Sequence, residues 1–76
     1  MKRQDEIIMT MQLISGNTRM YLDNMGEQQL KAYTYSLYCE AGKYYNLRFM
    51  TGEYYSIVRE CLDEILENID IILGYK

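Results

Sequence analysis

Tyrosines and carboxylates are the functional side chains that this sequence concentrates. Nine of its ten aromatic residues are tyrosines, and it has no histidine, tryptophan or proline. A tyrosine ring is a large apolar body with a polar tip, which suits half-buried positions and contact surfaces. The lack of histidine removes the commonest acid/base group and the commonest metal ligand. We therefore expect a surface that binds something, in preference to a site of catalysis.

Four of the tyrosines flank a single connection in the chain. Tyr44 and Tyr45 precede it and Tyr54 and Tyr55 follow it, so the four rings can gather at one place. Tyrosine is enriched in protein interfaces and among their hot spots. We predict a contact patch for a protein partner, with two cations at its rim: Tyr44, Tyr45, Phe49, Tyr54, Tyr55, Arg48 and Lys43.

Two other interpretations of these rings remain open. The rings can cover the end of a small core, or they can stack nucleotide bases while Lys43 and Arg48 bind phosphates. The other tyrosines are divided by their helical positions. We expect Tyr21, Tyr33 and Tyr38 to line the core, and we assign no role to Tyr35 or Tyr75.

Five carboxylates follow one another near the C-terminus: Glu60, Asp63, Glu64, Glu67 and Asp70. Paired carboxylates can act as acid and base or bind a divalent cation. Nothing in the sequence forms a pocket around these five, so we interpret them as a solvated helix face. Docking to a basic groove on a partner is the sharper alternative.

Motifs for catalysis and for metal binding are missing. Cys39 and Cys61 lie far apart with no C-x-x-C pair, whereas a structural zinc site needs about four ligands. The serines and cysteines have no histidine to activate them, and no G-x-S-x-G or phosphate-binding loop is present. We predict no enzymatic activity, no metal, no cofactor and two reduced, buried cysteines.

The charge is mildly acidic and uneven. The net charge is −3, and residues 53–76 hold six Asp/Glu against two Lys/Arg. That end should repel phosphates, so we do not expect a nucleic-acid partner. No apolar stretch approaches the roughly 20 residues that cross a bilayer, and the start does not resemble a secretory signal. We expect a cytoplasmic protein without a membrane segment.

Apolar spacing predicts helices along the chain. The clearest covers residues 52–73, where apolar residues recur at intervals of three and four, Thr51 can cap the start and Gly74 can end the helix. A second covers residues 27–41 or extends to residue 47. Its inner face is marked by Leu30, Tyr33, Leu37 and Ala41, with the polar Thr34 falling among them.

The N-terminal segment carries a heptad-like seam of apolar residues: Ile7, Met11, Ile14, Thr18, Tyr21 and Met25. We predict one helix over residues 3–24, with a kink at Gly16 or two shorter helices as alternatives, because Ser15, Gly16 and Asn17 form helix poorly. Between Gly42 and Gly52, strand-like alternation at residues 45–49 competes with a loop or a helical extension. A lone strand would need a second copy to pair with.

The prediction is a single all-α domain, 1–76, built as a small bundle of three principal helices. A domain this small buries only about 60% of its unfolded surface, which favours a homodimer. We expect a non-enzymatic interaction protein that occupies a partner's surface as an inhibitor, adaptor or immunity-type factor, of the kind that phages and other mobile elements encode. The alternatives are a binder of small nucleotides or single-stranded nucleic acid, and a structural oligomer subunit.

Overall fold

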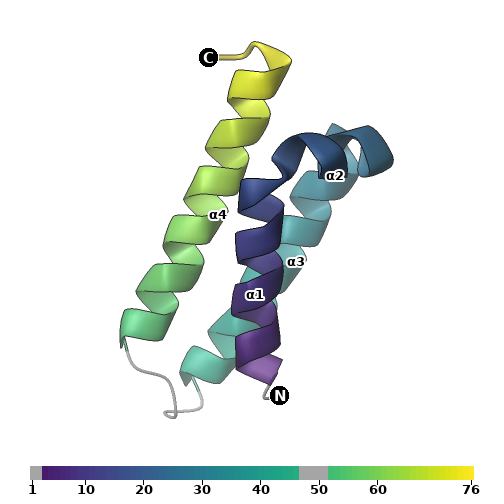
Figure 1. The fold of residues 1–76 in the computed structure, drawn as a ribbon. Helices are drawn as coiled ribbons and strands as arrows, with labels where there is room; N and C mark the ends of the chain where they lie inside the picture. The colour runs from purple at the N-terminus through teal and green to yellow at the C-terminus, as the bar shows by residue number, and fades with distance from the viewer. Residues whose placement is uncertain (1–2, 47–51) are drawn as a thin grey trace.

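Four helices form the part of the chain that the computed structural model describes, residues 3–46 and 52–76. They are α1 (Arg3–Gly16), α2 (Thr18–Met25), α3 (Glu27–Asn46) and α4 (Gly52–Leu73). In Figure 1, α1 and α4 run in the same direction, α3 runs antiparallel to them, and the short α2 lies at one end. The all-α prediction is confirmed. No helix in the described ranges is long and apolar enough to span a bilayer.

The prediction of three principal helices was wrong in number, because the N-terminal segment divides at Asn17 into α1 and α2. Side chains bond the carbonyl groups beside this break. Thr18 Oγ1 donates to the Ile14 carbonyl at 2.8 Å, and Asn68 Nδ2, from α4, donates to the Ser15 carbonyl at 3.2 Å. These bonds supply partners for backbone groups at a helix end, so α4 helps to fix the turn between α1 and α2.

The apolar seam of the N-terminal segment packs within the chain. Ile7, Met11 and Ile14 are 0% exposed, and Thr18 is buried beside them. One contiguous core joins residues from all four helices: Ile7, Met11, Ile14, Leu22, Leu30, Leu37, Ala41, Tyr54, Val58, Leu62, Ile65 and Ile69. Because the seam residues of α1 are buried against α3 and α4, they do not offer a free face to a second copy of the chain.

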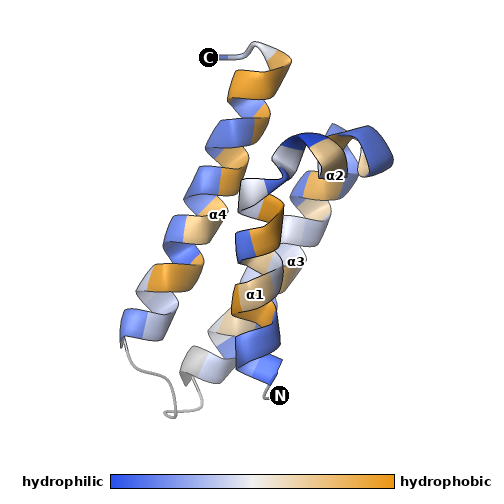
Figure 2. Cartoon of the chain, viewed as in Figure 1, coloured by the Kyte–Doolittle hydropathy of each residue, from blue (hydrophilic) through white to orange (hydrophobic). Residues whose placement is uncertain are grey.

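Helix α4 has the bounds predicted for it and is amphipathic along its length (Figure 2). Gly74 follows its last residue with a φ of 80°. The Tyr75 N–H donates to the Asp70 carbonyl at 2.8 Å, and the Gly74 N–H donates to the Ile71 carbonyl at 3.2 Å. This bond pair is a Schellman motif, which favours glycine at the left-handed position. The predicted stop at Gly74 is confirmed, whereas Thr51 lies outside the described residues.

Helix α3 extends beyond residue 41 to Asn46, so Tyr45 is helical and the strand-like alternation is not used there. Leu47 and Phe49 lie outside the described residues. The inner face holds Thr34, which is 0% exposed and donates its hydroxyl to the Leu30 carbonyl at 2.8 Å. Tyr33 is 37% exposed, so its predicted core position was wrong. Thr34 takes that place because the local hydrogen bond satisfies its hydroxyl.

Candidate functional site

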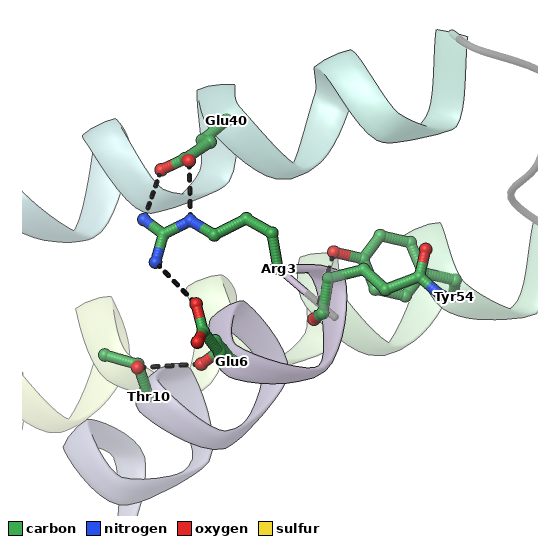
Figure 3. Close-up of polar contacts among 6 residues, drawn as sticks. Arg3, Glu6, Thr10, Glu40 and Tyr54 are labelled. Carbon is green, nitrogen blue, oxygen red and sulfur yellow. Dashed lines mark hydrogen bonds and ion pairs between the residues drawn. The ribbon is translucent and has the colours of Figure 1, made fainter. Parts of the chain in front are cut away.

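The structure turns the two tyrosines at the start of α4 to different surroundings. Tyr54 is 8% exposed and belongs to the core, with its hydroxyl 3.5 Å from the Gln4 carbonyl of α1 (Figure 3). Burial raises the pKa of the Tyr54 phenol. Tyr55 is half-buried and faces α3. Consecutive helical residues point about 100° apart, so only one ring of this pair can reach the core.

The rest of the predicted patch is described in part. Tyr44 is half-buried and packs against the core, and Lys43 is exposed. The backbone of Tyr45 belongs to α3, while its side chain, Arg48 and Phe49 lie outside what the structure describes. Their partner-binding role stays a prediction. The structure brings Tyr44 near Tyr54, but it places Tyr55 with a different ring.

That ring is Tyr38, on α3. The hydroxyls of Tyr38 and Tyr55 share a short hydrogen bond, and the ring centroids are 5.9 Å apart with planes tilted by 54°. Tilted ring pairs at this separation attract each other beyond the effect of burial. The shared hydrogen bond, and then burial, raise the pKa of Tyr38, which the nearby Arg59 lowers in part. Tyr38 was predicted to line the core, and it packs against the core from a half-buried position at the junction of α3 and α4.

A groove of about 420 Å³ opens beside this ring pair. Its lining comes from α3 and α4: Tyr35, Tyr38, Cys39, Gly42, Tyr55, Arg59, Leu62 and Asp63. Gly42 leaves it open on the α3 side, since a Cβ added there would meet nothing within 4 Å. Three tyrosine rings and Leu62 make the groove largely apolar, while Arg59 and Asp63 supply one charge of each sign.

A second hollow, of about 690 Å³, lies at the break between α1 and α2. Its lining includes Thr18 and Asn68, whose side chains are bonded to the carbonyls of the break. The other lining residues are mixed in polarity, with Met20 and Ile71 exposed at the edge. The polar groups there hold the fold together, so the groove between α3 and α4 is the better candidate for a binding site.

The groove has the chemistry of recognition. Cys39 lies exposed at its edge, so its predicted burial was wrong. No histidine in this sequence can activate its thiol. Burial raises the pKa of Cys61 on α4, which makes this second thiol a poor nucleophile. In the part of the chain that is described, no three Cys, Asp or Glu side chains are grouped to hold a metal ion. What remains is a fixed aromatic wall with a cation and a carboxylate.

Comparison with known proteins adds no relative to this picture. No protein family, no curated protein sequence and no solved structure matches the chain. Sequence reasoning missed Tyr35, Tyr38 and Arg59 as site residues. The available signal was Gly42, a glycine inside a segment that otherwise follows a helical pattern. Tyrosines and a cation also stand at the flanks of the apolar stripes of α3 and α4.

Proposed function

We propose that this chain is a non-enzymatic protein-interaction module, whose groove between α3 and α4 receives a segment of a partner protein. The observation that carries this proposal is the hydrogen-bonded Tyr38–Tyr55 pair at the side of an open groove. Rings fixed in advance lose little conformational freedom when a partner binds. Tyrosine and arginine are also the residue types that most often dominate binding energy, and Arg59 stands beside this pair.

The module acts by occupying a partner's surface, as an inhibitor, adaptor or immunity-type factor in the cytoplasm. Tyr55, which belongs to the sequence-predicted patch, remains in the proposed contact surface. Tyr35, Tyr38 and Arg59 are added to it. The other residues of the sequence-predicted patch that follow Gly42 closely in the sequence stay in the proposed contact surface: Lys43, Tyr44, Tyr45, Arg48 and Phe49. A homodimer remains a proposal that rests on the small size of the chain. It needs a face other than the buried α1 seam.

Selection of binding peptides tests the groove directly. A random library of displayed helical peptides is selected on the wild-type protein, and each clone is then measured on two variants. Gly42→Gln fills the open space of the groove, removes no contact and favours helix. Ala32→Gln is the matched control, because Ala32 is an exposed residue of the same helix outside the groove lining.

We expect the majority of clones to bind the wild type and Ala32→Gln equally and to show no binding to Gly42→Gln. Circular dichroism should show unchanged helicity for both variants, so that a loss of binding reports on the groove alone. Clones that bind Gly42→Gln as tightly as the wild type would show that the groove is not the binding surface.

Arg59 also favours a second candidate, a small nucleotide stacked on the tyrosines. A guanidinium among aromatic rings can bind a phosphate while a base stacks. The carboxylate of Asp63 and the acidic α4 oppose it, because they repel phosphates. Thermal melting with a panel of nucleotides separates the two. A ligand-dependent rise in melting temperature that Arg59→Gln removes would support nucleotide binding.

A further inference from the structure

Cations nearly balance the carboxylates on the first three helices, where Arg3, Arg19, Lys31 and Lys43 stand against Asp5, Glu6, Asp23, Glu27 and Glu40. Arg3 pairs with Glu6 at 3.1 Å and with Glu40 at 2.7 Å. Lys31 pairs with Glu27 at 3.0 Å, and Arg19 lies 3.9 Å from Asp23. These pairs leave little net charge on that side of the molecule.

Helix α4 is different. Glu53, Glu60, Asp63 and Glu64 are exposed, and none of them forms an ion pair within residues 3–46 and 52–76. Glu67 has only Lys76, at 3.8 Å, with both side chains more than half exposed. Exposed pairs of this kind contribute little. The outer side of α4 therefore carries unneutralised negative charge.

Part of this charge lies at the groove. Asp63 lines it, and Glu60 and Glu67 stand three residues before and four residues after Asp63. Helical residues at these spacings are neighbours on one side of the helix. The three carboxylates thus form a row about 10 Å long beside the groove, at 1.5 Å per residue. A partner helix with cations at the same spacing would match the row.

We propose that the groove receives a basic amphipathic helix of a partner protein, an inference that rests on the proposed function above. The apolar side chains of that helix pack on Tyr35, Tyr38 and Leu62, and its Lys or Arg side chains meet the carboxylate row. Attraction between opposite charges speeds encounter and sets the register. A second copy of this chain fits poorly, because it would present a row of the same sign.

Arg59 refines the description of the partner. Among the described residues that line the groove it is the one cation, and it lies close enough to the Tyr38 hydroxyl to lower the pKa of that phenol. A basic side chain placed against it would be repelled. The partner helix therefore presents an apolar or acidic residue opposite Arg59 and its basic residues toward Glu60, Asp63 and Glu67.

The composition of the groove-dependent peptides tests this inference. We expect clones that bind the wild type but not Gly42→Gln to carry Lys or Arg at intervals of three or four residues beside an apolar stripe. Their affinity should fall as salt is added. Asp63→Lys should weaken them at least about tenfold, as reversing a contacting charge does. Asp23→Lys, which changes the net charge equally at an exposed position of α2 outside the groove lining, should weaken them no more than about twofold.

Each other result decides against some part of the proposal. Groove-dependent peptides that are acidic or uncharged would overturn the basic helix and leave the proposed function standing. An equal loss in Asp63→Lys and Asp23→Lys would show that only net charge matters, which also overturns it. An oligothymidine probe that binds the wild type and not Gly42→Gln would assign the groove to single-stranded nucleic acid. If no clone depends on Gly42, both proposals fail.

Discussion

Arg3 and Glu40 form a two-point ion pair that fastens the start of α1 to α3. Arg3 Nε donates to Glu40 Oε1 at 2.7 Å and Nη2 donates to Oε2 at 2.8 Å, while Nη1 reaches Glu6 at 3.1 Å (Figure 3). The planar guanidinium suits this parallel pair of bonds. Glu40 lies on the α1 side of α3, between Tyr38 and Gly42 in sequence. The segment of α3 that lines the groove is thus held from behind.

This pair predicts a loss of stability in acid. Hydrogen bonds from Arg3 lower the pKa of Glu40, and a hydrogen bond from Lys31 lowers that of Glu27, both from an ordinary value of 4.5. A carboxyl whose pKa is lower in the folded state stabilises the fold above its unfolded pKa and loses that effect as pH falls through the folded pKa. The melting temperature should therefore drop as pH falls below 4.5.

Arg3→Met should reduce this acid sensitivity, since the hydrogen bonds that are the largest cause of the lowered pKa of Glu40 are then lost. Glu64→Gln is the matched control, because Glu64 is exposed and makes no ion pair within the described ranges. Melting followed by circular dichroism from neutral pH to about pH 3 gives the comparison. Identical profiles for Arg3→Met and the wild type would contradict the role of the pair.

The sequence predicted those parts of the fold that depend on helical period alone. The bounds of α4, its stop at Gly74 and the burial of Ile7, Met11 and Ile14 follow from spacing and local chemistry. Thr34 occupies the core position that was predicted for Tyr33, which shows where reasoning from helical period fails. Polarity ranks the tyrosine as the better core residue, yet the threonine hydroxyl is satisfied by its own helix and the larger ring stays outside.

The groove could not be predicted by the same reasoning. Its two ring partners are 17 residues apart and meet only because α3 and α4 pack at one particular register. Helical period places Tyr38 and Tyr55 at the flanks of their apolar stripes, but it does not say which flanks face each other. The division at Asn17 is similar, because one of its hydrogen bonds comes from Asn68 on α4.

Two glycines with equal space around them should respond oppositely to alanine. Neither Gly42 nor Gly26 has an atom within 4 Å of an added Cβ. Gly42 lies inside α3, where alanine stabilises a helix by roughly 1 kcal/mol over glycine. Gly26 has a φ of 80°, which alanine adopts at a cost of about 1–3 kcal/mol.

Urea unfolding of Gly42→Ala and Gly26→Ala measures both changes in the free energy of unfolding. We expect it to rise for Gly42→Ala and to fall for Gly26→Ala. Because the methyl group is the same and the space is open at both sites, the backbone conformation alone separates them. A loss of stability in Gly42→Ala would mean that α3 is not a regular helix at this position.

The Tyr38–Tyr55 hydrogen bond predicts an unusual titration. It is the largest cause of the raised pKa of Tyr38, so Tyr55→Phe should bring that pKa down toward its ordinary value of 10.0. The sign follows from the raised value: the protonated pair stabilises the fold below pH 10 and loses that effect as pH rises through the folded pKa. NMR of the tyrosine ring carbons resolves the single residue. Tyr35→Phe, on an exposed ring in the same groove, should leave the Tyr38 titration unchanged.

Replacing Tyr54 by alanine should mainly lower stability, whereas replacing Tyr55 by alanine should mainly weaken binding. Tyr54 is a core ring, and removing such a ring costs about 3–5 kcal/mol. That is a large part of the roughly 4–11 kcal/mol expected for a chain of this length. Tyr55→Ala loses a half-buried ring, at about 1 kcal/mol, and its hydrogen bond to Tyr38, at about 1 kcal/mol more. We expect Tyr54→Ala to melt far below Tyr55→Ala by circular dichroism.

Binding should show the reverse order. Groove-dependent peptides should no longer bind Tyr55→Ala, although this variant keeps its helicity. They should still bind Tyr54→Ala at a temperature where that variant is folded. The reason is geometric: Tyr55 lines the groove and Tyr54 does not. If Tyr54→Ala kept its stability and lost binding instead, the contact surface would lie where the sequence alone first placed it, on the rings that flank the connection from α3 to α4.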